Sequence, residues 1–139
     1  MPTRDDVERA RAVISGRVHR TPMFSSAALG AHLKAELFQK TGSFKARGAL
    51  NRIAALTADE RKRGVVTWSA GNHAQAVAWA AAQYDVDCLV CMWESASPMK
   101  VAATRGYGAT VDLSSRDPVV AYERARATDR VFVHPHDDP

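Results

Sequence analysis

The sequence has few cysteines and no long hydrophobic run. Of its 139 residues, 46% are hydrophobic and two are cysteine. None of the apolar runs approaches the roughly 20 residues of a membrane span, and the N-terminal residues are charged where a signal peptide would be apolar. These absences predict a cytoplasmic protein with no membrane partner. The length of 139 residues is that of one ordinary domain.

The two cysteines, Cys88 and Cys91, form a C-x-x-C pattern that elsewhere serves metal binding or redox chemistry. Here the pattern lies within the apolar run 87–92, which is typical of a buried strand. Residues three apart on a strand point to opposite faces of the sheet, so the two thiols are not placed to meet. We expect two core side chains and no metal at this position.

Aromatic residues are also scarce, at 7% of the chain, and the net charge is a modest +4. The basic residues are interleaved with acidic ones, as in segments 4–9 and 60–63, which is typical of solvated helix faces. No aromatic residues alternate with a basic stripe, as binding of a single-stranded nucleic acid would require. We therefore expect no nucleic-acid partner, and small anionic ligands fit the charge.

From residue 57 onward the chain alternates regularly between apolar strands and helices. Thr57 and Glu60 form a capping box, and Gly64 ends the short helix that they begin. Strands are predicted at 65–68, 87–92, 110–113 and 131–133, and helices at about 72–84, 97–108 and 117–128. This alternation predicts the α/β class, with a parallel sheet, flanking helices and right-handed crossovers.

The first 56 residues are less regular. A capping box predicts a helix over residues 3–16. Residues 32–37 alternate apolar and polar side chains, which predicts a half-buried strand, and residues 38–42 are expected to form a connecting loop. Ser43 is a candidate N-cap for a helix that continues to about residue 54.

Lys45 would lie in the first turn of that helix. The positive end of the helix dipole, together with partial burial, disfavours the charged ammonium form. A neutral amine is the form that attacks an aldehyde to make a Schiff base. The alternative is an ordinary surface lysine, although a helix entrance is a poor place for a cation.

Residues 69–73 form a second candidate site, at the end of one predicted strand and the start of the next helix. Open α/β sheets bind ligands at this place, and a glycine lets the backbone approach an anion. The segment consists of Ser69, Ala70, Gly71, Asn72 and His73. It is neither a P-loop nor a G-x-G-x-x-G fingerprint. The alternative is a capped helix start with a structural glycine.

Other polar and aromatic residues favour structural roles. His134 and His136 straddle a proline and have no partner cluster elsewhere, so we expect a solvated turn and no metal site. The three tryptophans, at positions 68, 79 and 93, are expected to pack in or near the core.

Four segments together resemble the threonine/serine dehydratases, which are pyridoxal-phosphate enzymes with a tryptophan-synthase-β-like fold. Segment 41–51, TGSFKARGALN, resembles the lysine motif of that family, and segment 69–75, SAGNHAQ, resembles its substrate-carboxylate loop. Segments 98–109 and 132–139 support the same assignment and follow in the family's order. The resemblance covers essentially the whole chain.

The resemblance implies a role for each residue of the two motifs. Lys45 would hold pyridoxal 5'-phosphate as a Schiff base and remove the Cα proton of the substrate. Phe44 would pack beside the cofactor, and Asn72 would hydrogen-bond its ring hydroxyl. The substrate carboxylate would be bound by the loop of Ser69, Ala70, Gly71, Asn72 and His73. The implied reaction eliminates the β-hydroxyl of L-threonine or L-serine, giving a 2-oxo acid and ammonia.

Ala70 bears on the kind of reaction. In the related serine racemases this position is a serine that acts as acid and base on the opposite face of the substrate, and alanine cannot transfer a proton. The resemblance therefore implies elimination rather than racemisation.

The chain also departs from the family in its length. Family members are more than twice as long, and their phosphate cradle lies in the C-terminal half. We expect residues 1–56 to be the start of the large domain with the lysine helix and residues 57–139 a small βα domain. The C-terminal half would then be absent and the isolated chain inactive, with a homo-oligomer or a complementing half as possible partner. The alternatives are a non-catalytic α/β fragment or partner-binding module, and a nucleotide binder that uses the Gly71 loop.

Overall fold

The computed structural model describes residues 2–136, which form α-helices, β-strands and two short 3-10 helices. The helices are α1 (Arg4–Ile14), α2 (Lys45–Ala54), α3 (Ala58–Arg63), α4 (Asn72–Ala82), α5 (Pro98–Gly106) and α6 (Pro118–Arg126). The strands are β1 (Met23–Ser26), β2 (Ala31–Lys34), β3 (Val65–Trp68), β4 (Cys88–Trp93), β5 (Thr110–Ser115) and β6 (Val131–Phe132). The 3-10 helices are η1 (Glu36–Phe38) and η2 (Lys40–Gly42).

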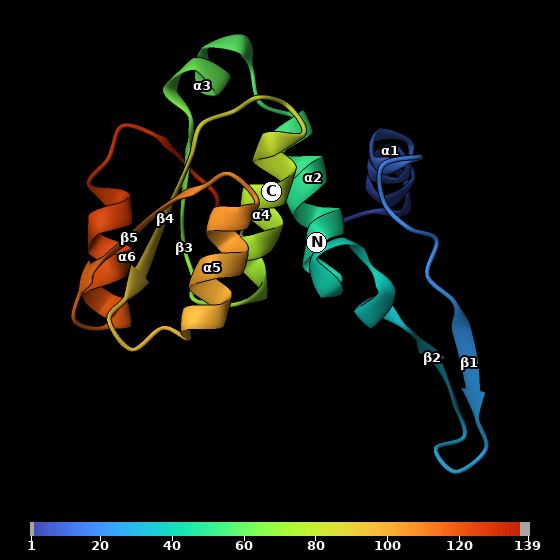
Figure 1. The fold of residues 1–139 in the computed structure, drawn as a ribbon. Coiled ribbons are helices and arrows are strands. Elements are labelled where there is room, and N and C mark those ends of the chain that lie inside the picture. Colours follow the sequence, from blue (N-terminus) through green and yellow to red (C-terminus); the bar gives the residue numbers. More distant parts are fainter. Residues whose placement is uncertain (1, 137–139) are drawn as a thin grey trace.

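Four strands form one parallel sheet in the order β5-β4-β3-β6. Helices α4 and α5 lie on one side of the sheet and α6 lies on the other, and α2 packs on the outer side of α4 (Figure 1). The predicted α/β class with a flanked parallel sheet is confirmed. The predicted strand at 65–68 matches β3 to the residue, and the other predicted strands and helices of this part differ only at their ends.

Each face of the sheet has its own hydrophobic core. The larger core joins the sheet to α2 and α4 and contains Leu50, Ile53, Val77 and Cys88. The smaller core lies under α6 and contains Cys91. The two cysteines are therefore on opposite faces, as the strand geometry predicts, and both are free and buried. Burial raises the pKa of the Cys88 thiol to about 12, so it is an inert core side chain.

Local signals in the sequence explain where several helices begin and end. The capping box predicted at Thr3 is present before α1, and the one at Thr57 is present before α3. Asp117 caps α6 by accepting hydrogen bonds from the amides of Val119 and Val120. Gly64 ends α3 with a φ of +75°, a backbone conformation that favours glycine.

Two predictions for the first 56 residues are wrong. The strand expected over 32–37 ends at Lys34, and its side chains are exposed rather than half-buried, because no described segment packs over either face. Ser43 is not the N-cap of α2. Phe44 occupies that position, and the buried hydroxyl of Ser43 has no hydrogen-bond partner in the described part of the chain.

Strands β1 and β2 pair as an antiparallel hairpin that extends away from the four-stranded sheet (Figure 1). The hairpin and η1 carry exposed apolar side chains, among them Phe24, Leu33 and Leu37. Arg47 of α2 anchors the base of this region through a two-pronged ion pair with Glu36, and this guanidinium holds the pKa of Glu36 at about 2. Within residues 2–136, no helix is both long and apolar enough to cross a membrane.

Candidate active site

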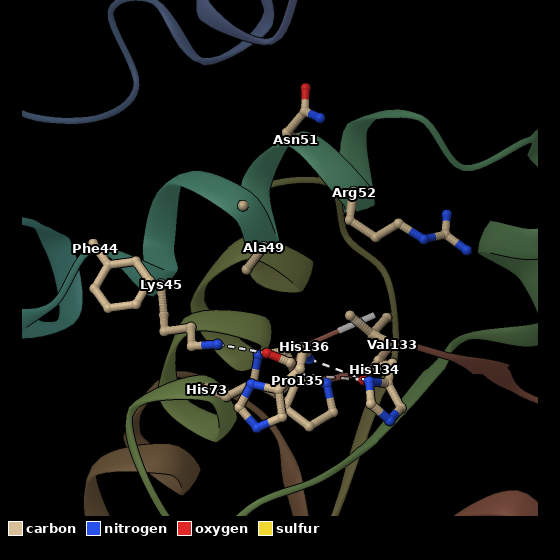
Figure 2. A pocket seen from close by; sticks show the side chains of 11 residues that line it. Phe44, Lys45, Ala49, Asn51, Arg52, His73, Val133, His134, Pro135 and His136 are labelled. Atoms are coloured by element: carbon tan, nitrogen blue, oxygen red, sulfur yellow. Dashed lines mark hydrogen bonds between the residues drawn. The ribbon is translucent and has the colours of Figure 1, made fainter. Parts of the chain in front are cut away.

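Lys45 is the first residue of α2, as the sequence predicts. Its Nζ atom donates a hydrogen bond of 2.5 Å to the backbone carbonyl of Pro135 and lies 5.5 Å from the centre of the Phe44 ring. The Phe44 ring itself is exposed. Lys45 is partly buried against the turn that follows β6 (Figure 2). The neutral form of this amine, expected from the helix dipole, stays a prediction.

The second predicted segment, residues 69–73, joins β3 to α4. Gly71 is the N-cap of α4, and no side chain caps the first amides of that helix. The Ser69 hydroxyl accepts a hydrogen bond of 3.1 Å from the amide of Gly71, which closes the turn on itself. The uncapped amides and the Asn72 side chain at the helix start are donors available to an anion.

Lys45 and the 69–73 turn line a common hollow. Its volume is about 370 Å³, which is within the range of small-molecule sites. Lys45, Ser69, Asn72 and His73 contribute to its walls, and the remaining lining residues are Trp68, Trp93, Lys100, Pro135 and His136. A second hollow of about 360 Å³ lies beside it, and Phe44, Gly48, Ala49 and Asn51 help to line this one. Lys45 and His73 are among the residues that border both hollows, and Figure 2 shows them in the lining of the second one.

His73 is buried at the base of both hollows. Its Nε2 atom lies 3.3 Å from the carbonyl oxygen of Val133. Burial lowers the pKa of His73 from 6.5 to about 4, against the opposing effect of this hydrogen bond. The ring is therefore neutral at neutral pH, and its Nε2–H group can donate a hydrogen bond to the carbonyl oxygen of Val133.

The charges around the hollows favour an anionic ligand. No aspartate or glutamate is among the described residues that line either hollow, whereas Lys45 and Lys100 both line the one beside Ser69. Two lysine side chains, uncapped amides and a hydroxyl form a donor-rich surface without an opposing carboxylate. Such a surface binds phosphate or carboxylate groups.

The structure brings together four of the predicted site residues: Lys45, Ser69, Asn72 and His73 share one hollow. Phe44 lines only the neighbouring hollow. Gly71 lies beside the site, because a side chain built on it would come within 3.9 Å of both the Lys100 Nζ and the Ser69 Oγ. Ala70 packs instead against the larger core.

The prediction of a solvated turn after β6 is confirmed only in part, because His136 is exposed and His134 is half-buried. Pro135 is buried, accepts the Lys45 hydrogen bond and lines both hollows together with His136. The carboxyl ends of parallel strands meet at one edge of the sheet, and this rule could have placed the turn beside residues 69–73. No group of residues that could hold a metal is found within the described residues. Residues 137–139, which belong to the fourth segment of the family resemblance, lie outside the described residues.

The parallel sheet, together with the lysine and the turn that line a hollow at the carboxyl ends of its strands, defines a class of protein: an open α/β domain with a candidate ligand site at that edge. The sequence model of the family described as "Pyridoxal-phosphate dependent enzyme" matches residues 14–139. The chain belongs to this family of pyridoxal-phosphate-dependent enzymes, whose cofactor is pyridoxal 5'-phosphate.

Similar proteins of known sequence or structure agree with this assignment. The chain is 44% identical to the L-threonine ammonia-lyase of Thermotoga maritima, in a match that covers 100% of the chain and 37% of the relative. It is 42% identical to the solved threonine deaminase of T.th., with a TM-score of 0.87 and coverage of 99% and 46%. Maize serine racemase is 35% identical, with a TM-score of 0.88 and coverage of 96% and 44%. The chain thus spans about two-fifths of the length of the curated relatives it matches.

The residues of the site fit the cofactor of the family. A primary amine borders two connected spaces, and the Phe44 ring beside it offers an aromatic surface. Asn72 is exposed at the start of α4 and can reach into the hollow that it lines. The absence of acidic groups among the described lining residues suits a ligand that carries a phosphate.

Proposed function

We propose that the protein is a pyridoxal-phosphate-dependent ammonia-lyase of the threonine/serine dehydratase type. The observation that carries the proposal is the single hollow lined by Lys45 and by the turn of residues 69–73. Lys45 would anchor the cofactor aldehyde, and the turn would hold an amino acid against the cofactor. The substrate would be L-threonine or L-serine, as the names of the relatives from Thermotoga maritima and T.th. suggest.

The chain's own residues divide the work between the two sides of the hollow. Lys45 would hold the cofactor through its aldehyde, and its Nζ would take the Cα proton of the substrate. Asn72 would hydrogen-bond the ring hydroxyl, while Phe44 packs beside the ring. When bound, the cofactor ring accepts the electron pair left at Cα. Loss of the β-hydroxyl as water and hydrolysis of the released enamine then give a 2-oxo acid and ammonia.

The substrate carboxylate would be held by the turn that contains Gly71. Ser69, Asn72 and the free amides of α4 donate to its oxygens. His73 is buried and neutral, and it would position the turn through its contact with Val133. A carboxylate fixed in this way places the Cα proton on the side of Lys45.

Racemisation is the second candidate activity, because maize serine racemase is structurally similar. A racemase needs a second acid or base on the opposite face of the substrate, where the family resemblance places residue 70. Ala70 has only a methyl group, which carries no transferable proton. Elimination is therefore the favoured reaction.

The proposal extends to the whole protein. Residues 1–56 would belong to the large domain and residues 57–139 to the small domain of a fold-type II enzyme, acting in the cytoplasm. The larger core nevertheless joins α2 to the sheet across this boundary. The chain spans about two-fifths of the length of its curated relatives, so the proposed activity is that of the whole protein.

Borohydride reduction followed by peptide mass spectrometry tests the proposal. The chain incubated with pyridoxal phosphate should acquire one reduced adduct, located on Lys45 and lost in Lys45→Ala. Lys62→Ala is the matched control, because Lys62 is an exposed lysine on α3. Labelling spread over many lysines would favour a non-catalytic α/β module, and tight nucleotide binding without a Lys45 adduct would favour a nucleotide-binding protein.

A further inference from the structure

Lys100 lies beside the predicted carboxylate-binding turn, although it is distant from it in the sequence. It is in the first turn of α5 and lines the same hollow as Lys45 and Ser69. A side chain built on Gly71 would come within 3.9 Å of the Lys100 Nζ. The ammonium group therefore lies beside Gly71, where the turn has no side chain of its own.

Nothing in the described part of the chain accounts for this ammonium as a structural group. Its Nζ makes no hydrogen bond or ion pair with a described residue, and the residue is exposed. A cation in the first turn of a helix opposes the helix dipole, at a typical cost of about 0.3–1 kcal/mol. Ser97, the N-cap of α5, makes no capping hydrogen bond that would reduce this cost. Lys100 is thus a charge in an unfavourable place that faces a hollow.

The other donors around the turn are neutral. Ser69 and Asn72 offer a hydroxyl and an amide, and the start of α4 offers backbone amides. His73 is uncharged at neutral pH because burial lowers its pKa to about 4. A hydrogen bond in which one partner is charged is roughly twice as strong as a neutral one. Among the described residues around this hollow, Lys100 is the ammonium group not already assigned to the cofactor.

We propose that Lys100 binds the α-carboxylate of the amino-acid substrate and selects for substrates in which this group is charged. The inference rests on the proposed function, since it names a further binding residue of the same site. A carboxylate has one charge and two oxygens. It therefore matches one ammonium group together with the hydroxyl and amides of the turn, whereas a phosphate dianion would call for further cations.

The test compares binding of L-threonine with binding of L-threoninamide, which has the same side chain but no carboxylate. Trp68 and Trp93 line the hollow, so their fluorescence reports binding to the cofactor-free chain. The unsubstituted chain should prefer L-threonine by about tenfold, which is the lower end expected for one charge-assisted contact at an exposed site. Lys100→Met should lose this preference and leave the affinity for L-threoninamide unchanged. Lys62→Met, on α3, is the control and should retain the preference.

Several results would overturn the inference. These are an unchanged carboxylate preference in Lys100→Met, an equal loss in Lys62→Met, and no carboxylate preference in the unsubstituted chain. Failure of the Lys100 inference can be distinguished from failure of the proposed function. A Lys45 adduct combined with an unaltered preference in Lys100→Met rejects only the role of Lys100. A Lys100-dependent preference in a chain that forms no Lys45 adduct rejects only the lyase proposal.

Discussion

The Nζ atom of Lys45 lies 2.5 Å from the carbonyl oxygen of Pro135, a residue 90 positions further along the chain. Helix α2 supplies the amine, and the turn after β6 supplies the acceptor. The contact exists because β6 is an edge strand of the parallel sheet and ends at the same edge as β3. A lysine that precedes the sheet in sequence is thereby held at the carboxyl ends of its strands, where α/β folds bind ligands.

The first prediction concerns His73. Burial lowers its folded-state pKa to about 4, below the ordinary value of 6.5, so the unfolded chain binds the proton more tightly in this interval. Stability should therefore fall as the pH falls from 6.5 towards 4. The loss attributable to His73 is about 2 kcal/mol between about pH 7 and about pH 5. Urea unfolding at the two pH values measures it.

The matched variants for this experiment are His73→Asn and His32→Asn. His32 is an exposed histidine of β2. The pH-dependent loss should be smaller by about 2 kcal/mol in His73→Asn and unchanged in His32→Asn. Equal pH dependence in all three proteins would show that His73 is not buried as described.

A second prediction concerns the Glu36–Arg47 ion pair that anchors α2 to η1. The guanidinium lowers the pKa of Glu36 from 4.5 to about 2. Its stabilisation is therefore fully present above pH 4.5 and is lost as the pH falls towards about 2. Both side chains are partly exposed, so we expect Glu36→Gln to cost about 1.5 kcal/mol near neutral pH.

A double-mutant cycle with Arg47→Met isolates the contribution of this pair. The coupling energy should be about 1 kcal/mol near neutral pH and should fall to less than half of this value as the pH is lowered to about 2, the folded-state pKa of Glu36. A coupling energy that stays constant across this range would contradict the assigned ion pair.

The third prediction concerns Gly64, which ends α3 with a φ of +75°. An alanine methyl group at this position would lie 2.8 Å from the backbone oxygen of Asp87, which cannot move without disturbing the start of β3. We expect Gly64→Ala to lower the free energy of unfolding by about 2 kcal/mol or more. Gly106→Ala is the control, since nothing lies within 4 Å and its φ is ordinary. It should change stability by no more than about 1 kcal/mol.

The fourth prediction concerns the apolar hairpin. Phe24 and Leu33 are directly opposite each other on β1 and β2, and they are 53% and 45% exposed. An isolated two-stranded hairpin with such side chains favours association, so the 139-residue chain should form dimers or larger species. Light scattering after gel filtration should show less association for the Phe24→Ser/Leu33→Ser variant. Val119→Ser, which removes an exposed valine from α6, should leave association unchanged.

The sequence was most informative where local signals and tertiary packing agree. The capping box at Thr57, the turn glycine at position 64 and the apolar run 65–68 each report a local preference that the fold retains. Of the predicted site residues, Lys45, Ser69, Asn72 and His73 line one hollow, whereas Ala70 packs against the larger core. Helix starts and strand ends are local features, and the topology of a parallel sheet brings them together.

The sequence was least informative where packing or long-range contact decides the structure. Residues 32–37 have the alternation of a half-buried strand, yet the strand ends at Lys34 and its side chains are exposed. The position of Pro135 against Lys45 depends on strand order, which the alternation of elements does not specify. The approach of Lys100 to Gly71 also depends on long-range packing, because it arises only when α5 packs on α4.

The central claim is that the Lys45 amine and the 69–73 turn face the same ligand. A crystal structure of the chain after borohydride reduction with pyridoxal phosphate tests it most directly. The account predicts a reduced pyridoxyl group on Lys45, with its ring in the hollow beside Asn72 and Ser69. A pyridoxyl group that extends into solvent, with the turn out of its reach, would contradict the account.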